Sequence, residues 1–98
     1  MKKTTPLEKD IEKAIGTYAK SKGCLYYKFT SPAMRAVPDR IIVTPTGVVG
    51  FLEVKREGAK PTPLQMVEIT KLAQRGAEVE WADNVADGKK FIDMLLEL

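Results

Sequence analysis

The chain has no histidine among its 98 residues. This absence excludes Ser-His and Cys-His catalysis, Cys2His2 zinc sites and every nuclease mechanism that uses a histidine base. Asp, Glu, Lys and Tyr remain for acid–base or metal chemistry. We therefore look for a functional site among carboxylates and amines.

Cysteine and long apolar runs are also scarce. Cys24 is the only cysteine, so no intrachain disulfide can form, which fits a reducing compartment. We expect its side chain to be a small buried hydrophobe. No apolar run reaches the length of a membrane span, and the lysines at the start are not followed by the apolar core of a signal peptide. The sequence predicts a cytoplasmic protein without a membrane segment.

The composition is that of a small globular protein, with 44% hydrophobic and 30% charged residues. The length predicts a single domain over residues 1–98. A domain of this size buries only about two-thirds of its unfolded surface, so a partner subunit would add stability. The net charge of +3 permits contact with a polyanion without requiring it.

Hydrophobic periodicity and turn signals predict the order α-β-β-β-α-β-α, an α/β fold with a central mixed sheet flanked by helices. Thr5-Pro6-Leu7-Glu8 predicts a helix start, with Thr5 as the cap and Pro6 as the first helical residue. Thr62-Pro63-Leu64-Gln65 repeats this signature. The expected strands cover residues 24–29, 39–44, 48–55 and 78–82, and the helices end near 22, near 75 and beyond 96.

Two of these strands form the most informative segment. Thr44-Pro45-Thr46-Gly47 is a turn signal, so the strands on either side should pair as an antiparallel hairpin. That pairing would return Asp39 to the side of Glu53. Lys55 lies two residues after Glu53 and points to the same face. Two carboxylates with an adjacent amine can hold a divalent cation and position a water, which is the chemistry of phosphodiester cleavage.

Each of these residues also has a purely structural interpretation. Asp39 follows Pro38 and could be an ordinary turn aspartate. Glu53 and Lys55 could form a weak ion pair at a solvated strand end. Against this, charges seldom follow a buried apolar run directly unless they are paired. The three residues together favour a site.

Glu8 and Gln65 each have two interpretations that remain open. Both would stand three residues after a capping threonine, where Glu or Gln returns a hydrogen bond to the cap. Glu8 also falls at the edge of the apolar stripe of the first helix, close enough to lean over the site, whereas Glu12 falls further towards solvent. Gln65 could instead meet a phosphate or a water at the site.

Several basic residues border this segment, and most basic residues on a small protein only keep it soluble. Those that we consider for phosphate contact are Lys28, Arg35, Arg40, Arg56 and Lys60. Tyr26, Tyr27, Phe29 and Trp81 are expected in the core rather than as base-stacking groups. The last helix carries Phe91, Ile92, Met94, Leu95 and Leu96, more apolar residues than one buried stripe requires, and we expect a dimer surface there.

The ordered set Val37-Pro38-Asp39, Glu53-Val54-Lys55 and Gln65 resembles the VRR-NUC domain, a branch of the PD-(D/E)xK nuclease superfamily. The resemblance runs from Glu8 through Gln65. It implies a restriction-endonuclease-like core and DNA cleavage that depends on Mg2+ or Mn2+. Stand-alone members of this size are similar to phage and bacterial Holliday-junction resolvases, which act as homodimers on four-way DNA.

By this resemblance, Asp39 and Glu53 are metal ligands, with the Val54 carbonyl as a third. Lys55 matches the catalytic lysine, Gln65 the motif glutamine and Glu8 the acidic residue of the first helix. One departure from the family pattern is visible, because the glycine that often precedes the aspartate is replaced here by Ala36 or Val37. Two other functions remain open, namely a non-catalytic DNA-binding module and a small interaction domain with this fold.

Overall fold

The elements follow one another in the order that the sequence predicts. The computed structural model describes residues 6–98. The helices are α1 (Glu8–Ser21), α2 (Pro63–Gln74) and α3 (Val85–Glu97), and the strands are β1 (Leu25–Lys28), β2 (Arg40–Val43), β3 (Val49–Val54) and β4 (Glu78–Ala82). The predicted order α-β-β-β-α-β-α is therefore confirmed.

The four strands form one mixed sheet in the order β1-β2-β3-β4. β1 and β2 are antiparallel, as are β2 and β3, whereas β3 and β4 are parallel. Arg40 lies opposite Leu52 in the predicted hairpin, so the residue before Arg40 comes beside the residue after Leu52. The turn uses Gly47 at a φ of 88°, a left-handed conformation that glycine adopts without steric cost. A parallel pair needs a long crossover connection, and α2 lies within it.

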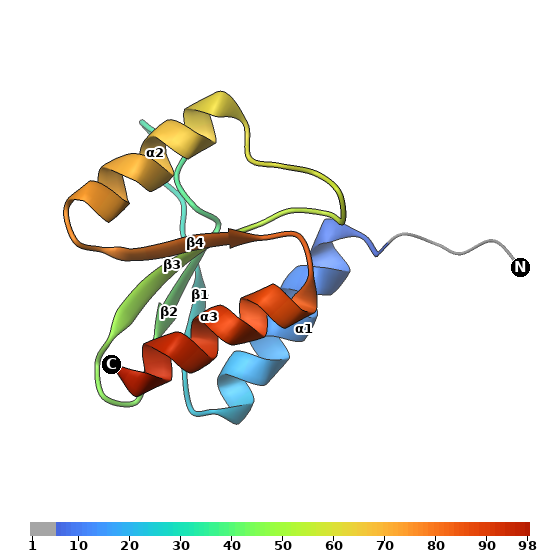
Figure 1. The fold of residues 1–98 in the computed structure, drawn as a ribbon, viewed down its shortest axis with the longest axis vertical. Coiled ribbons are helices and arrows are strands. Elements are labelled where there is room, and N and C mark those ends of the chain that lie inside the picture. Colours follow the sequence, from blue (N-terminus) through green and yellow to red (C-terminus); the bar gives the residue numbers. More distant parts are fainter. Residues whose placement is uncertain (1–5) are drawn as a thin grey trace, which may run out of the picture.

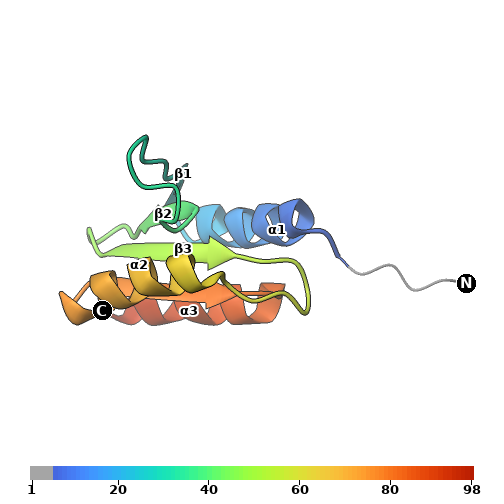
Figure 2. The same cartoon turned by 90° about the horizontal axis from the view of Figure 1, so that it is seen from above.

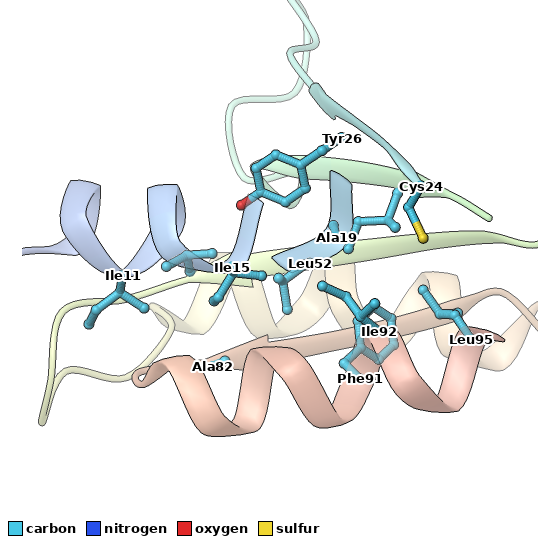
Figure 3. Packing of buried hydrophobic residues seen from close by; sticks show 12 residues of the cluster. Ile11, Ile15, Ala19, Cys24, Tyr26, Leu52, Ala82, Phe91, Ile92 and Leu95 are labelled. Carbon is cyan, nitrogen blue, oxygen red and sulfur yellow. The ribbon is translucent and has the colours of Figure 1, made fainter. Parts of the chain in front are cut away.

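The helices cover the two faces of the sheet unequally. α1 and α3 lie side by side on one face, and α2 lies on the other, beside β4 (Figures 1 and 2). Strand alternation sends Ile42, Leu52 and Val54 to the α1–α3 face, where each is fully buried. Figure 3 shows the resulting core, with Ile15 of α1, Leu52 of the sheet and Ile92 of α3 in one cluster.

A glycine sets the distance between the two helices of this face. A Cβ placed on Gly88 of α3 would lie 2.3 Å from Cδ1 of Ile15 on α1, closer than real Cβ atoms approach any neighbour. The lack of a side chain at Gly88 therefore lets α1 and α3 pack closely. Both helices can then reach the same sheet face.

The prediction of a dimer surface on the last helix is wrong for most of its residues. Phe91, Ile92 and Leu95 are buried, and Leu96 packs against the same core, which leaves Met94 as the exposed member of the set. The reason is that α3 packs on both the sheet and α1, so it buries a wider stripe than one contact surface requires.

Exposed apolar side chains lie instead on the half of the sheet that α2 leaves open. Leu25, Tyr27 and Val49 are between 43% and 56% exposed there. The core prediction is thus confirmed for Tyr26, wrong for Tyr27, and only partly met by the half-buried Phe29 and Trp81. Cys24 is buried, as expected. In the part of the chain from residue 6 onwards, no helix has the length and apolarity to cross a bilayer.

Candidate active site

Three carboxylates from different elements meet at the carboxyl end of β3. They belong to Glu8 at the start of α1, Asp39 just before β2, and Glu53 near the end of β3. One oxygen from each side chain lies within 4.8 Å of the others. This end of the sheet also receives the first turns of both α1 and α2. Residues far apart in the sequence are therefore brought to one point.

Backbone hydrogen bonds hold Asp39 in this position. Its carbonyl oxygen accepts a hydrogen bond from the Phe29 N–H at 2.7 Å, which extends the β1–β2 pairing by one step. Its Oδ2 atom accepts a bond from the Val54 N–H at 3.4 Å. The side chain is thus fixed between the two strands of the hairpin. Asp39 belongs to the carboxylate cluster and lies at a bend directly before β2.

Glu53 is the most deeply buried of the three acids, at 1% exposure. Its Oε2 atom pairs with Lys55 Nζ at 3.2 Å and accepts a hydrogen bond from Gln65 Nε2 at 3.2 Å. Its Oε1 atom is also buried, yet no group within residues 6–98 donates a bond to it. A buried carboxylate oxygen without a donor is costly. A cation among the three acids would satisfy it.

Burial and mutual repulsion raise the proton affinity of these acids. Loss of water contact, with the charge of Asp39 second, raises the pKa of Glu53 to about 7. Burial also raises the pKa of Asp39 above its ordinary value. The pKa of Glu8 is raised too, first by burial and then by Asp39. Clustered acids of this kind are typical of functional sites, because cation binding offsets their repulsion.

Glu8 stands at the first helical position and not at the third, where a capping box requires the acid. The helix begins at Glu8 itself, and its N-cap Leu7 makes no side-chain hydrogen bond. Pro6 precedes the helix, so its predicted place as the first helical residue is wrong, and Thr5 lies outside the described residues. The Glu8 carboxylate lies with those of Asp39 and Glu53, and its part in catalysis stays a prediction.

The Gln65 side chain both caps α2 and contacts the carboxylate cluster. Its Oε1 atom accepts the Thr62 N–H at 2.9 Å, and Thr62 Oγ1 accepts the Gln65 N–H at 3.2 Å, which is the predicted capping box. Its Nε2 atom donates to Glu53. The cap of α2 is therefore bonded directly to the buried acid.

The predicted phosphate-contacting residues are spread around the cluster. Lys28 and Arg35 line a cavity of about 260 Å³ that reaches Asp39. Arg56 and Lys60 are exposed on the connection from β3 to α2. Arg40 is half-buried and pairs with Glu12. Their contacts with DNA stay predictions, as does the role of the Val54 carbonyl.

Glu12 is a residue whose position the sequence pattern placed wrongly. It does not point further towards solvent than Glu8, because its carboxylate pairs with Arg40 on β2. The buried face of α1 contains Ile11, Ile15, Gly16 and Ala19. The small residues among these were absent from the predicted stripe, and including Gly16 and Ala19 turns the stripe towards Glu12.

The donors in the cluster fit a hard divalent cation. Mg2+, Mn2+ and Ca2+ prefer carboxylate, carbonyl and water oxygens, and Glu8, Asp39 and Glu53 offer only oxygens. The buried Oε1 atom of Glu53, which has no hydrogen-bond partner among the described residues, would gain one from such a cation. The site is thus equipped to hold such an ion beside the amine of Lys55.

Known proteins resemble the chain in both sequence and structure. It is 42% identical over 72 residues to "Putative nuclease p44" of Acyrthosiphon pisum secondary endosymbiont phage 1, which covers 74% of the chain and 77% of that protein. A solved structure described as a VRR_NUC domain superposes with a TM-score of 0.80 at 29% identity, over 88% of the chain and 94% of the other.

A second solved structure, described as a VRR_NUC domain protein, shares the fold with a TM-score of 0.76 at 15% identity, over 96% of the chain and 91% of the other. A search of family models finds no match. The chain belongs to the VRR-NUC nuclease family.

Proposed function

We propose that the protein is a divalent-metal-dependent endodeoxyribonuclease that hydrolyses phosphodiester bonds in branched DNA such as four-way junctions. The observation that carries the proposal is the buried Oε1 of Glu53, which has no donor among the described residues and lies within the three-carboxylate cluster. A DNA-binding module without catalysis would gain nothing from carboxylates that repel phosphate.

The residues in and around the cluster have different proposed roles. Glu8, Asp39 and Glu53, with the Val54 carbonyl, would hold Mg2+ or Mn2+. When bound, the ion supplies charge stabilisation at the phosphate and a lower pKa of water. Lys55 Nζ is 3.2 Å from Glu53 and 16% exposed, so it can turn from the carboxylate towards a phosphate or a water. Gln65 keeps the second face of Glu53 in place.

The likeness to Holliday-junction resolvases leads us to propose a homodimer of single 98-residue domains. Two identical sites related by a two-fold axis would make the paired cuts that a four-way junction requires. Exposed apolar side chains on the open sheet face and on α2 provide surface for such a contact, namely Leu25, Tyr27, Val49, Leu64 and Val67. We place this activity in the cytoplasm of a bacterial or phage-infected cell, in keeping with the phage relative.

One experiment tests substrate and metal together. Purified protein is incubated with linear, flapped and four-way DNA, each with Mg2+, with Mn2+ or with EDTA. We expect cutting of the four-way DNA with either ion and none with EDTA, and a dimer mass by light scattering. Cleavage that persists in EDTA would contradict the metal site. Equal cutting of all three substrates would contradict only the preference for branched DNA.

A further inference from the structure

A basic groove runs along α1, on the side of this helix away from α3. It has a volume of about 430 Å³ and is lined by residues of α1, β1 and β2. Its charged lining consists of Lys9, Lys13, Lys20, Lys28, Arg40 and Glu12. These residues carry five positive charges and one negative charge. This local excess is larger than the net charge of +3 on the whole chain.

The floor of the groove is rigid. The ring of Tyr26 packs against Gly16 of α1, where a Cβ would come within 2.6 Å of the ring. Tyr26 Oη donates to the Glu12 carbonyl at 2.8 Å. The Arg40 guanidinium lies 4.6 Å from the Tyr26 ring centroid and pairs with the Glu12 carboxylate. The single acid of the groove is thus neutralised, and the lysines face a fixed surface.

Charge is distributed differently elsewhere on the molecule. The groove between β4 and α3 carries Glu80, Asp83 and Asp87 against Lys90, an excess of negative charge. A polyanion would be repelled there and attracted along α1. The groove along α1 is therefore better suited to a phosphate backbone than the groove between β4 and α3.

The basic groove adjoins the carboxylate cluster through Lys28, which also lines the cavity that reaches Asp39. Lys9 follows Glu8 directly, and Arg40 follows Asp39. From Lys9 to Lys20 the helix rises about 16 Å, at about 1.5 Å per residue. One DNA strand carries a phosphate about every 3.4 Å along its axis, so about five phosphates would lie beside this stretch.

We propose that this groove binds the DNA phosphate backbone on one side of the scissile bond, with Lys9, Lys13 and Lys20 as the contacts. The proposal rests on the proposed nuclease function and adds the path of the substrate. Phosphate contacts fix the position and register of DNA without reading its sequence. The groove therefore holds a DNA arm of any sequence in line with the carboxylates.

The test measures binding and cleavage separately. Binding of a fluorescein-labelled DNA duplex is followed by anisotropy in EDTA over a range of salt concentrations, and cleavage is assayed with Mg2+. The triple variant Lys9→Gln/Lys13→Gln/Lys20→Gln is compared with Lys71→Gln/Lys89→Gln/Lys90→Gln, which removes the same charge outside the groove. The lysines of both variants are exposed.

The groove variant should bind about tenfold more weakly or worse, and the slope of log K against log salt should fall by about 0.9 for each phosphate that the variant no longer neutralises. The control should stay within about twofold of the wild type. Equal weakening in both variants would overturn the groove, because it would show an effect of net charge alone. If the wild type cleaves DNA and the groove variant binds DNA normally, this inference is overturned, but the proposed nuclease function is not. A wild type that neither binds nor cleaves overturns both.

A second pair of variants covers the case in which the triple variant fails to fold. Thr17 lines the groove and Thr70 lies on α2, and both are exposed helical residues. Thr17→Glu places a negative charge in the path of the phosphates, and Thr70→Glu places one outside it. Weaker binding by Thr17→Glu alone supports the groove, and equal binding by both overturns it.

Discussion

Two helix starts with nearly the same sequence behave differently in this protein. At Thr62-Pro63-Leu64-Gln65, the threonine and the glutamine form a complete capping box at the start of α2. At Thr5-Pro6-Leu7-Glu8, the helix begins at Glu8, and its N-cap Leu7 has no side-chain hydrogen bond. The same pattern therefore predicts that a helix starts, but not which residue starts it.

The difference determines how each helix contributes to the carboxylate cluster. The α1 start leaves the Glu8 carboxylate free to join Asp39 and Glu53. The α2 start uses both ends of the Gln65 amide, one for its own cap and one for Glu53. One start thus adds a charge to the site, and the other adds a fixed donor.

The largest effect should follow from changing Glu53. This buried acid contacts Gln65 of the α2 start and lies in one cluster with Glu8 of the α1 start. Glu53→Gln keeps the shape of the side chain but removes the charge of the buried carboxylate that we propose as a metal ligand, so cleavage should fall about a thousandfold, about 4 kcal/mol in the barrier. Circular dichroism should show an intact fold. Glu57→Gln, an exposed acid on the next connection, is the control and should cut normally. Wild-type cleavage by Glu53→Gln would contradict the site.

The raised pKa of Glu53 should also make the stability of the protein depend on pH. The pKa of Glu53 lies at about 7, against an ordinary 4.5, so the folded protein binds this proton more tightly than the unfolded chain. The stability from this group is fully present below about 4.5 and is lost as pH rises through about 7.

Without metal, the melting temperature should fall over this window in the wild type and less in Glu53→Gln. Added Mg2+ should raise it more at about pH 8 than at about pH 5.5, because the ligands must lose their protons. Differential scanning calorimetry measures both effects. A metal effect that is larger at the lower pH would contradict the assignment.

Glu8→Gln tests the start of α1 and should have an intermediate effect. We expect metal affinity to fall about tenfold, about 1.4 kcal/mol, because one ligand charge is removed. Asp10→Asn is a matched control, since it also removes an acid from the first turn and weakens the helix dipole interaction equally. Glu8→Gln should melt no lower than Asp10→Asn, because it also relieves repulsion from Asp39, and only Glu8→Gln should titrate weakly with Mn2+ in calorimetry. Equal metal affinity of Glu8→Gln and Asp10→Asn would contradict the proposed ligand role of Glu8.

Thr62→Ala tests the start of α2 and should have the smallest effect. Removal of the cap costs about 1 kcal/mol, or about 4–8 °C in melting temperature for a domain of this size. It should also loosen Gln65 and lower the cleavage rate by far less than Glu53→Gln does. Thr62→Ser should restore both values. A normal rate at the lower melting temperature would mean that the box supports the helix alone.

The sequence predicted the element order and the pairing that places Asp39 beside Glu53. Both depend on local rules, namely strand alternation and a turn at Gly47. The predicted boundaries were less accurate at α1, because the competing cap positions differ by two residues and the contacts of Glu8 lie elsewhere in the chain. Such contacts are tertiary and leave no local pattern.

Two further differences concern the surface of α1. Buried Gly16 and Ala19 turn this helix further onto the sheet than its large apolar residues indicate, which brings Glu12 to Arg40. The groove lysines of α1 were not predicted to contact DNA, because they lie outside the nuclease motif. Lys9, Lys13 and Lys20 nevertheless share one face of α1 at helical spacing, and this signal is present in the sequence.

Gly88 connects the far side of the molecule to the active site. The close contact of Gly88 with Ile15 fixes the position of α1 relative to α3. The same helix carries Glu8 and the groove lysines Lys9, Lys13 and Lys20. A methyl group at position 88 would push α1 outwards, so Glu8 and the groove lysines would move with it. The tolerance of this enzyme to sequence change is therefore narrow at a small, buried residue that takes no part in chemistry. Efforts to alter its substrate range should keep Gly88 and vary the exposed side of α1.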